Sequence, residues 1–189
     1  MTAMLSAEQE YNKLTTNLPY KAKIIYKIGL FWTILHYIVM IVTFGANKQF
    51  RNYITTIGPW IGSPADWKGQ QITNYVDMLA IIKHELRHVR QFNIAGLYIS
   101  PIVGIIPGFI AYAFLPLPIG FAWFRWLMER DGYSESIRVY KYFYGTEGMN
   151  EAIDQATAEL TGGAYGWTMP FKKYVKNWFT IKALKTEGL

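Results

Sequence analysis

The chain has 189 residues, a length that suits one domain or one domain with a small appendage. It contains no cysteine, which excludes disulfide scaffolds, zinc ribbons, iron–sulfur clusters and thiol catalysis, and its three histidines are too few for a large histidine cluster. Charged residues make up 17% of the chain against about 25% in typical soluble domains, so either much of the surface contacts apolar material or part of the chain lies in lipid. The net charge of +6 is compatible with anionic partners but does not indicate which one.

Residues 1–20 are mixed and polar. They predict a loosely held arm or a short surface helix, ahead of a single domain over 21–189. The segment 28–46 then contains no aspartate, glutamate, lysine or arginine, and three lysines precede it. This apolar helix has two interpretations, a membrane anchor or a buried helix of a compact domain.

A short strand is predicted over Tyr53–Ile57, followed by turns at Gly-Pro and Ser-Pro steps. The clearest helix covers residues 74–95, where apolar side chains recur at helical spacing. Thr73 and Asn74 are the candidate caps at its start, and Gly96 is the candidate stop at its end.

The stretch 96–128 carries a single charge and four prolines. This spacing argues against one straight transmembrane helix and favours a re-entrant pair, or an apolar loop-and-helix region packed under the preceding helix. Further helices are predicted over 121–145, 149–161 and 170–185. In the last of these, lysines flank an apolar face that we expect to dock on the core.

The five residues from His84 to His88 read HELRH, an HExxH motif inside the helix predicted over 74–95. Side chains four apart on a helix are neighbours, so both imidazoles can bind one zinc ion. Glu85 follows the first histidine directly, and its carboxylate can reach a zinc-bound water and act as general base. The alternative is an ordinary helix with two surface histidines. A di-iron site would need a second Glu-x-x-His, which the chain lacks.

A catalytic zinc site takes three protein ligands and leaves the fourth position open. No histidine follows His88, so the third ligand is either a downstream carboxylate or His36. Glu129 is our first choice, because it opens a polar stretch after the apolar run and Gly132 would let its helix approach the HExxH helix closely. Glu135 is the second choice. The remaining downstream candidates are Asp131, Glu151 and Asp154.

The sequence HELRHVRQF with a downstream ERDGY, which spans Glu129 to Tyr133, resembles the gluzincin class of zinc metallopeptidases. It is similar more narrowly to small stand-alone HExxH peptidase-like proteins of the minigluzincin type, known from bacterial and phage genomes, in which a Pro-Leu-Pro step precedes the glutamate. The resemblance covers about residues 50–145. It implies a zincin-like fold of the α+β class, predominantly helical. In that fold the HExxH helix and the glutamate helix pack with a small antiparallel sheet, and the edge strand near Tyr53–Ile57 holds an extended peptide.

These residues predict a zinc metallopeptidase acting on a peptide or protein. His84, His88 and Glu129 would bind Zn²⁺, and Glu85 would be the general base. Amide hydrolysis also needs a group that stabilises the transition state, and Tyr133 is our choice for it. Arg138 and Tyr140 are the other candidates.

Non-catalytic interpretations stay open as well. The chain could be a structural component of a larger assembly, such as a phage particle, or a membrane protein that retains an HExxH zinc site. The apolar segments 28–46 and 97–120 are candidate contacts with such an assembly or membrane, and they favour that location over a free cytoplasmic one. In the peptidase interpretation residues 74–145 form the expected catalytic core and residues 146–189 supply the C-terminal helices. No nucleic-acid partner is expected in any of these interpretations.

Overall fold

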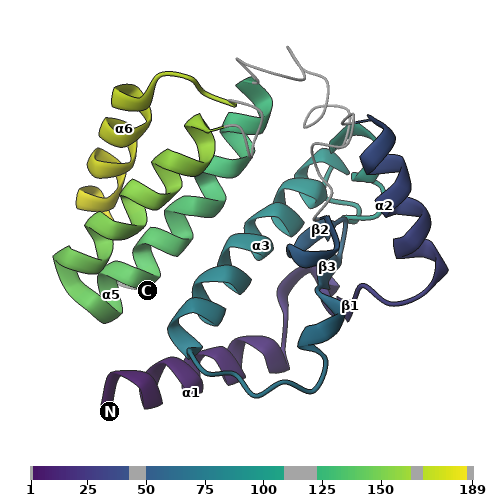
Figure 1. Cartoon of the computed structure of the whole chain (residues 1–189), viewed down its shortest axis with the longest axis horizontal. Helices are drawn as coiled ribbons and strands as arrows, with labels where there is room; N and C mark the ends of the chain where they lie inside the picture. Colours follow the sequence, from purple (N-terminus) through teal and green to yellow (C-terminus); the bar gives the residue numbers. More distant parts are fainter. Residues whose placement is uncertain (1, 43–49, 109–122, 163–167, 187–189) are drawn as a thin grey trace.

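The computed structural model describes residues 2–42, 50–108, 123–162 and 168–186 (Figure 1). This part of the chain is mainly helical with one small sheet, which confirms the predicted α+β class. The helices are α1 (Thr2–Thr16), α2 (Leu30–Val42), α3 (Tyr75–Ala95), α5 (Trp123–Thr161) and α6 (Lys172–Lys185). The strands are β1 (Lys23–Tyr26), β2 (Thr55–Ile57) and β3 (Trp60–Ser63). Short 3₁₀ turns are η1 (Pro19–Lys21), η2 (Phe50–Asn52) and η3 (Ala65–Trp67).

The sheet is mixed, which corrects the antiparallel sheet that the resemblance implied. Its strand order is β1-β3-β2, with β1 parallel to β3 and β2 antiparallel to β3. A two-residue turn joins β2 to β3, and Gly58 adopts the positive φ of 59° that this tight connection requires. The chain between β1 and β3 is long and includes α2, which allows the parallel pairing. The strand predicted over Tyr53–Ile57 is present as β2, at one edge of the sheet.

Helix α3 is the central element of the molecule, and it matches the helix predicted over 74–95. The side chain of Asn74 accepts hydrogen bonds from the backbone N–H groups of Val76 and Asp77, which caps the first turn. One side of α3 packs on the sheet, where Ile82 and Leu86 join the buried Ile61 of β3. The remaining side faces α5, so both flanks of the helix are covered.

Helix α5 reverses direction at Gly145, whose φ of 67° and ψ of −150° interrupt the helical backbone. This break agrees with the two helices predicted over 121–145 and 149–161. The two halves and α6 share one core, in which Trp126 and Ile137 from the first half meet Ile153 from the second and Phe179 from α6. Figure 1 shows these three helical segments as a layer beside α3.

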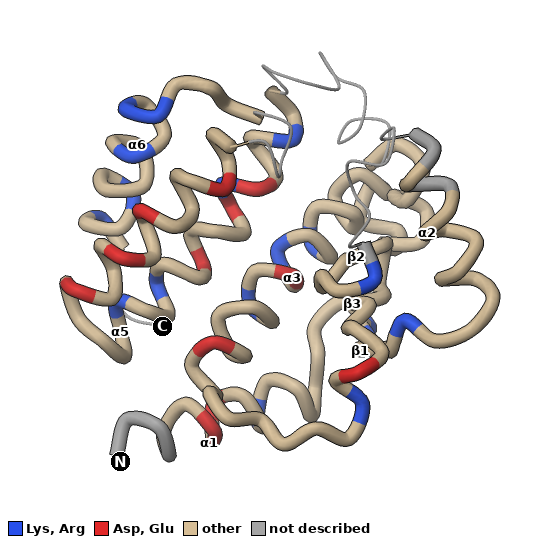
Figure 2. Tube along the Cα trace, viewed as in Figure 1, with Lys and Arg blue, Asp and Glu red and all other residues tan. Residues whose placement is uncertain are grey.

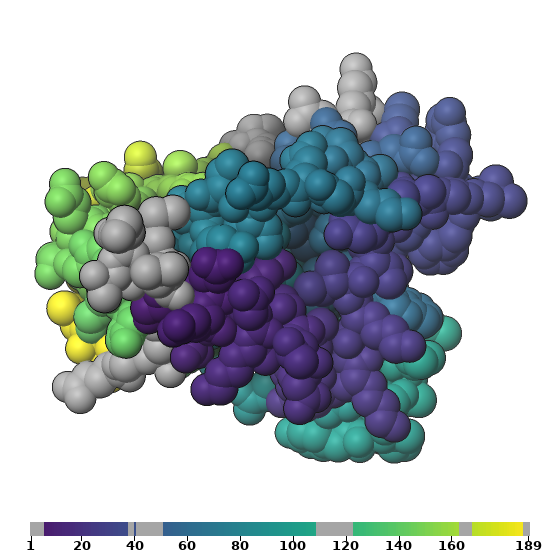
Figure 3. All heavy atoms as spheres, turned by 90° about the horizontal axis from the view of Figure 1, so that it is seen from below, coloured from purple at the N-terminus to yellow at the C-terminus, as the bar shows by residue number. Residues whose placement is uncertain are grey.

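The N-terminal residues form α1, a helix held against α3 (Figure 3). Ala7 is fully buried in a cluster with Val76 and Leu79, and Tyr11 packs edge-on against Tyr75 with ring centroids 5.7 Å apart. The surface-helix alternative for residues 1–20 is therefore the correct one.

The two apolar segments are described only in part. Within 28–46, α2 covers Leu30–Val42, and residues 43–46 lie outside the described residues; so do residues 109–120 of the segment 97–120. Among the residues that the structure describes, no helix combines the length and the apolar character that a bilayer crossing requires.

Candidate metal centre

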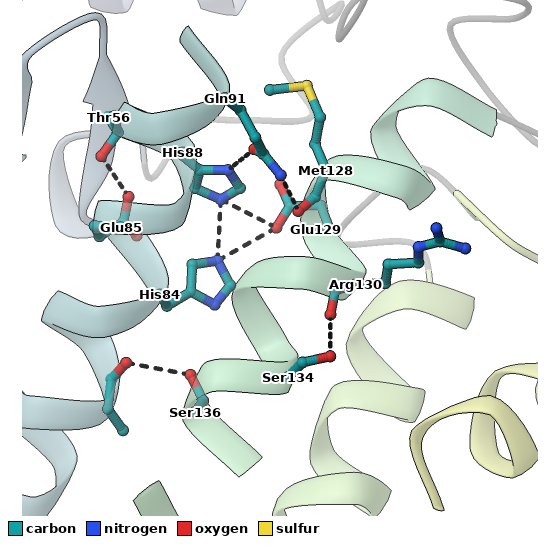
Figure 4. Close-up of polar contacts among 11 residues, drawn as sticks. Thr56, His84, Glu85, His88, Gln91, Met128, Glu129, Arg130, Ser134 and Ser136 are labelled. Atoms are coloured by element: carbon teal, nitrogen blue, oxygen red, sulfur yellow. Dashed lines mark hydrogen bonds and ion pairs between the residues drawn. The ribbon is translucent and has the colours of Figure 1, made fainter. Parts of the chain in front are cut away.

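Helix α3 and the first half of α5 bring three potential metal ligands together. His84 and His88 lie one turn apart on the face of α3 that meets α5, and Glu129 projects from α5 between them (Figure 4). All three side chains are buried, and their ligand atoms lie within 4.8 Å of one another. Within the described parts of the chain, this is the one grouping of three histidine, aspartate or glutamate side chains that could hold a metal ion.

The distances within this group suit a tetrahedral zinc ion. The Nε2 atoms of His84 and His88 are 3.1 Å apart, and Glu129 Oε2 lies 3.5 Å from the first and 3.6 Å from the second. Two ligand atoms bound tetrahedrally at about 2.0–2.1 Å from zinc lie about 3.3 Å apart. The three residues therefore fit this metal without a large rearrangement.

Gln91 fixes the orientation of the second histidine. Its amide nitrogen donates a hydrogen bond to the carbonyl oxygen of Met128 at 3.0 Å, so its amide oxygen faces His88 Nδ1 at 2.9 Å. Because that oxygen is an acceptor, Nδ1 carries the hydrogen, and in the neutral imidazole Nε2 keeps its lone pair on the side of Glu129. A partner on the far ring nitrogen is the usual means of orienting a metal-binding histidine.

The electrostatics of the group favour a positive charge at its centre. Burial alone would lower the pKa of His88, but the Glu129 carboxylate outweighs burial and raises it to about 9. Burial alone would raise the pKa of Glu129, and the imidazoles of His88 and His84 instead hold it well below its usual range. Without a metal ion, His88 therefore carries a proton at neutral pH, and this proton supplies the positive charge beside Glu129. A bound metal cation would supply that positive charge instead.

The metal-free protein should lose stability in mildly alkaline solution because of this pairing. A His88 pKa raised from 6.5 to about 9 stabilises the fold fully below pH 6.5, and the contribution disappears as the pH rises through about 9. The Glu129→Gln variant lacks the carboxylate that raises this pKa. We expect the free energy of unfolding, measured by urea denaturation after EDTA treatment, to fall more steeply between pH 6.5 and about 9 in the wild type than in Glu129→Gln. Parallel pH profiles would contradict the pairing.

Gly132 lies where α5 packs closely on α3. A Cβ atom added there would come within 2.7 Å of His84 Nε2, so a larger residue does not fit. The imidazole cannot easily move away, because the rings of Tyr133 and His88 both pack against it, with centroids 4.8 Å and 4.9 Å from its own. The close approach predicted from this mid-helix glycine is confirmed.

Replacing Gly132 with alanine should reverse the usual effect of that substitution. In an open helix the change stabilises by about 1 kcal/mol. Here the clash with His84 should instead destabilise the metal-free protein by about 1–3 kcal/mol, the typical cost of overpacking. Urea denaturation measures the effect, and Asp131→Ala, at the exposed neighbouring position, is the control that should change little. A net gain in stability for Gly132→Ala would contradict the geometry.

Glu85 is held on the sheet side of the histidine pair. Thr56 of β2 donates a hydrogen bond from its hydroxyl to Glu85 Oε2 at 2.7 Å (Figure 4). The buried Lys27 binds the same edge strand and the chain just before it. Its Nζ donates hydrogen bonds to Thr55 Oγ1 and to the Tyr53 carbonyl oxygen. Burial lowers the pKa of Lys27 to about 8, although the negative Glu85 partly opposes this shift. Thr56 thus connects the edge strand with the predicted general base, and Lys27 holds the strand in place.

Glu135, the second choice for the third ligand, lies outside the group. Its carboxylate accepts a hydrogen bond from Arg87 Nε at 2.8 Å and pairs with Arg138 Nη2 at 3.1 Å. The other candidates also lie outside it. Asp131 and Glu151 are exposed, Asp154 pairs with Lys176, and His36 is on α2.

The predicted transition-state stabilisers differ in their surroundings. Tyr133 has its ring against His84, which places the residue beside the candidate centre. Tyr140 donates its hydroxyl to Asp77 Oδ1 at 2.8 Å, and Arg138 is engaged by Glu135. Of the three, Tyr133 is the one in contact with a predicted ligand, and its catalytic role stays a prediction.

Two partners of the site were not assigned a role from the sequence. Gln91 lies one turn after His88 on the same helix face, so its spacing was a usable signal. Thr56 is 29 positions from Glu85, and nothing in the sequence indicates that they meet.

Comparison with protein-family models, with curated proteins and with solved structures found no match to the chain. Any function assigned to it therefore depends on the chemistry of its own residues.

Proposed function

We propose that the chain is a zinc-dependent peptidase with a zincin-like, gluzincin-type site. His84, His88 and Glu129 would hold the zinc ion, and Glu85 would act as general base. The observation that carries this proposal is the convergence of the three ligand atoms within 4.8 Å, with Glu85 on the same helix turn. The donor set of two imidazoles and one carboxylate is typical of catalytic zinc with an open position.

Bound zinc supplies Lewis-acid polarisation and lowers the pKa of its bound water to about 7. Glu85 takes a proton from the attacking water as the new C–O bond forms, and returns it to the amine nitrogen as the peptide C–N bond breaks. The Thr56 hydroxyl orients the carboxylate for this transfer through its bond to Oε2. Gln91 keeps the His88 ring turned toward the ligand group.

The edge strand supports a peptide as the substrate. In the strand order, β2 lies at one edge of the sheet, and its Thr56 contacts Glu85. An extended peptide added along the outer edge of β2 would therefore pass beside the general base. Tyr133, whose ring packs against His84, would donate a hydrogen bond to the oxyanion that develops during attack.

A structural zinc site is the second candidate function. Its support is the burial of the ligand group, since His84 and His88 are each 9% exposed and Glu129 is 3% exposed. A metal held there would tie α3 to α5 and need no substrate. This interpretation predicts zinc binding and stabilisation without turnover.

One experiment separates the two candidates. The zinc-loaded full chain is incubated with a diverse peptide library in ¹⁸O-labelled water, and the products are identified by mass spectrometry. The peptidase proposal predicts new carboxyl termini carrying the label, which are absent with Glu85→Gln and with His84→Ala. Stoichiometric zinc without any cleavage would favour the structural site, and cleavage that persists in Glu85→Gln would contradict the proposed base.

A further inference from the structure

Helix α2 carries an apolar face that the described parts of the chain leave exposed. Leu30, Phe31, Ile34 and Tyr37 are 74%, 59%, 50% and 59% exposed. Positions 30, 34 and 37 follow the spacing that places side chains on one face of a helix, and position 31 adjoins them. These four side chains are called the α2 outer face.

The opposite side of α2 is fixed to the sheet. Trp32 is buried, and a Cβ atom added at Gly62 of β3 would come within 2.5 Å of its indole ring, so the ring lies directly against the strand. With one side packed in this way, a surface helix normally presents polar side chains on the other side. The α2 outer face instead presents apolar and aromatic side chains to solvent. Exposed apolar surfaces of this kind commonly mark a docking site.

The sequence segment that contains α2 carries charges of one sign only. Arg51 Nη2 donates a hydrogen bond to Thr33 Oγ1 at 2.6 Å, which places an exposed guanidinium beside the helix. Figure 2 shows no acidic residue on α2, and several on α5. Between positions 11 and 65 the sequence contains no aspartate or glutamate, and the exposed basic side chains that the structure describes there are Lys13, Lys21, Lys23 and Arg51.

We propose that the α2 outer face docks on the surface of an anionic phospholipid bilayer. The aliphatic and aromatic side chains would enter the boundary between headgroups and acyl chains, as those of interfacial helices do. Arg51 would lie at the level of the lipid phosphates, and Tyr37 has the amphipathic ring that favours this depth. The proposal does not depend on zinc or on catalysis.

The charge pattern favours lipid over a second copy of the chain. In a symmetric dimer each α2 outer face would meet its own equivalent, so the Arg51 guanidinium beside each face would be brought toward its copy and repelled. Anionic headgroups would instead neutralise this charge. The lysine-rich α6 also exposes Ile181 and Leu184, but lysines at 182 and 185 alternate with them, so it offers no comparable uncharged face.

Flotation of the full chain with vesicles tests the proposal. Phosphatidylcholine vesicles are compared with vesicles that also contain phosphatidylserine, at low and high ionic strength. We expect binding to the anionic vesicles that weakens with salt. The double variant Leu30→Ser with Ile34→Ser should weaken it about tenfold or more, because two apolar side chains no longer leave water. Arg51→Gln should weaken it roughly fivefold, the usual effect of one basic residue at such a surface.

Matched changes on α6 are the controls, since α6 lies at the opposite end of the molecule (Figure 1). Ile181→Ser with Leu184→Ser, and Lys182→Gln, should leave flotation unchanged, and circular dichroism checks that every variant is folded. Absence of binding to anionic vesicles would overturn the proposal, and so would an equal loss in the α6 variants. A dimer in sedimentation velocity that the Leu30 and Ile34 changes dissociate would overturn it in favour of a copy–copy interface.

Discussion

Glu129→Gln should remove high-affinity zinc binding, whereas Glu135→Gln should leave it intact. The Glu129 carboxylate oxygen lies 3.5 Å and 3.6 Å from the two imidazole Nε2 atoms, and glutamine keeps the shape of the side chain while removing its charge. We expect a loss larger than the roughly 10–100-fold that removal of an outer partner costs. Competition titration with a chromophoric zinc chelator measures the affinity of each variant.

Two further variants are compared with Glu129→Gln. Glu135→Gln breaks the pairs with Arg87 and Arg138, so it can lower stability, but it should still bind one zinc per folded chain. Gln91→Ala removes the partner of His88 Nδ1 and should give an intermediate loss, about 10–100-fold. A wild-type affinity in Glu129→Gln, or a greater loss in Glu135→Gln, would mean that the wrong carboxylate has been assigned.

Glu85→Gln should keep the zinc ion and the fold and lose peptide hydrolysis. Glutamine can still accept the hydrogen bond from Thr56, but its amide cannot take a proton from water. General-base catalysis typically contributes about 10²–10⁴-fold, so the rate constant for cleavage should fall by that factor. The measurement is the initial rate on a peptide identified in the library experiment, at saturating zinc.

Thr56→Val tests the same prediction with a milder change. It removes one hydrogen bond to Glu85 and leaves the carboxylate itself in place, so we expect a smaller loss of activity than in Glu85→Gln. Zinc content should be unchanged in both variants, because neither residue belongs to the ligand group. Loss of zinc together with activity in Glu85→Gln would show that the residue supports the site's structure and would remove its assignment as the base.

The elements that the sequence predicted well depend on local physics. The helix over 74–95 follows from its apolar spacing and its asparagine cap, both of which are visible within a few residues. The approach of α5 to α3 was predicted from Gly132, because a glycine within a helix needs a packing reason. The same local pattern placed Glu129, rather than Glu135, on the side that faces the histidines.

The features that could not be predicted depend on contacts between distant positions. Strand β1 is four residues long, and its parallel partner β3 is far along the chain, so no hairpin signal marks the pair. Lys27 reads as a surface charge in the sequence, yet it is 1% exposed and holds the edge strand. The bond from Thr56 to Glu85 likewise exists only because β2 packs on α3.

The zinc content of the full chain, purified without a metal-affinity tag, tests the central claim most directly. Native mass spectrometry of the wild type and of His84→Ala, each dialysed against the same zinc-buffered solution, gives the stoichiometry. The account predicts one zinc per wild-type chain and none in His84→Ala. A wild-type chain that binds no zinc under these conditions, or a His84→Ala variant that binds as much as the wild type, would contradict it.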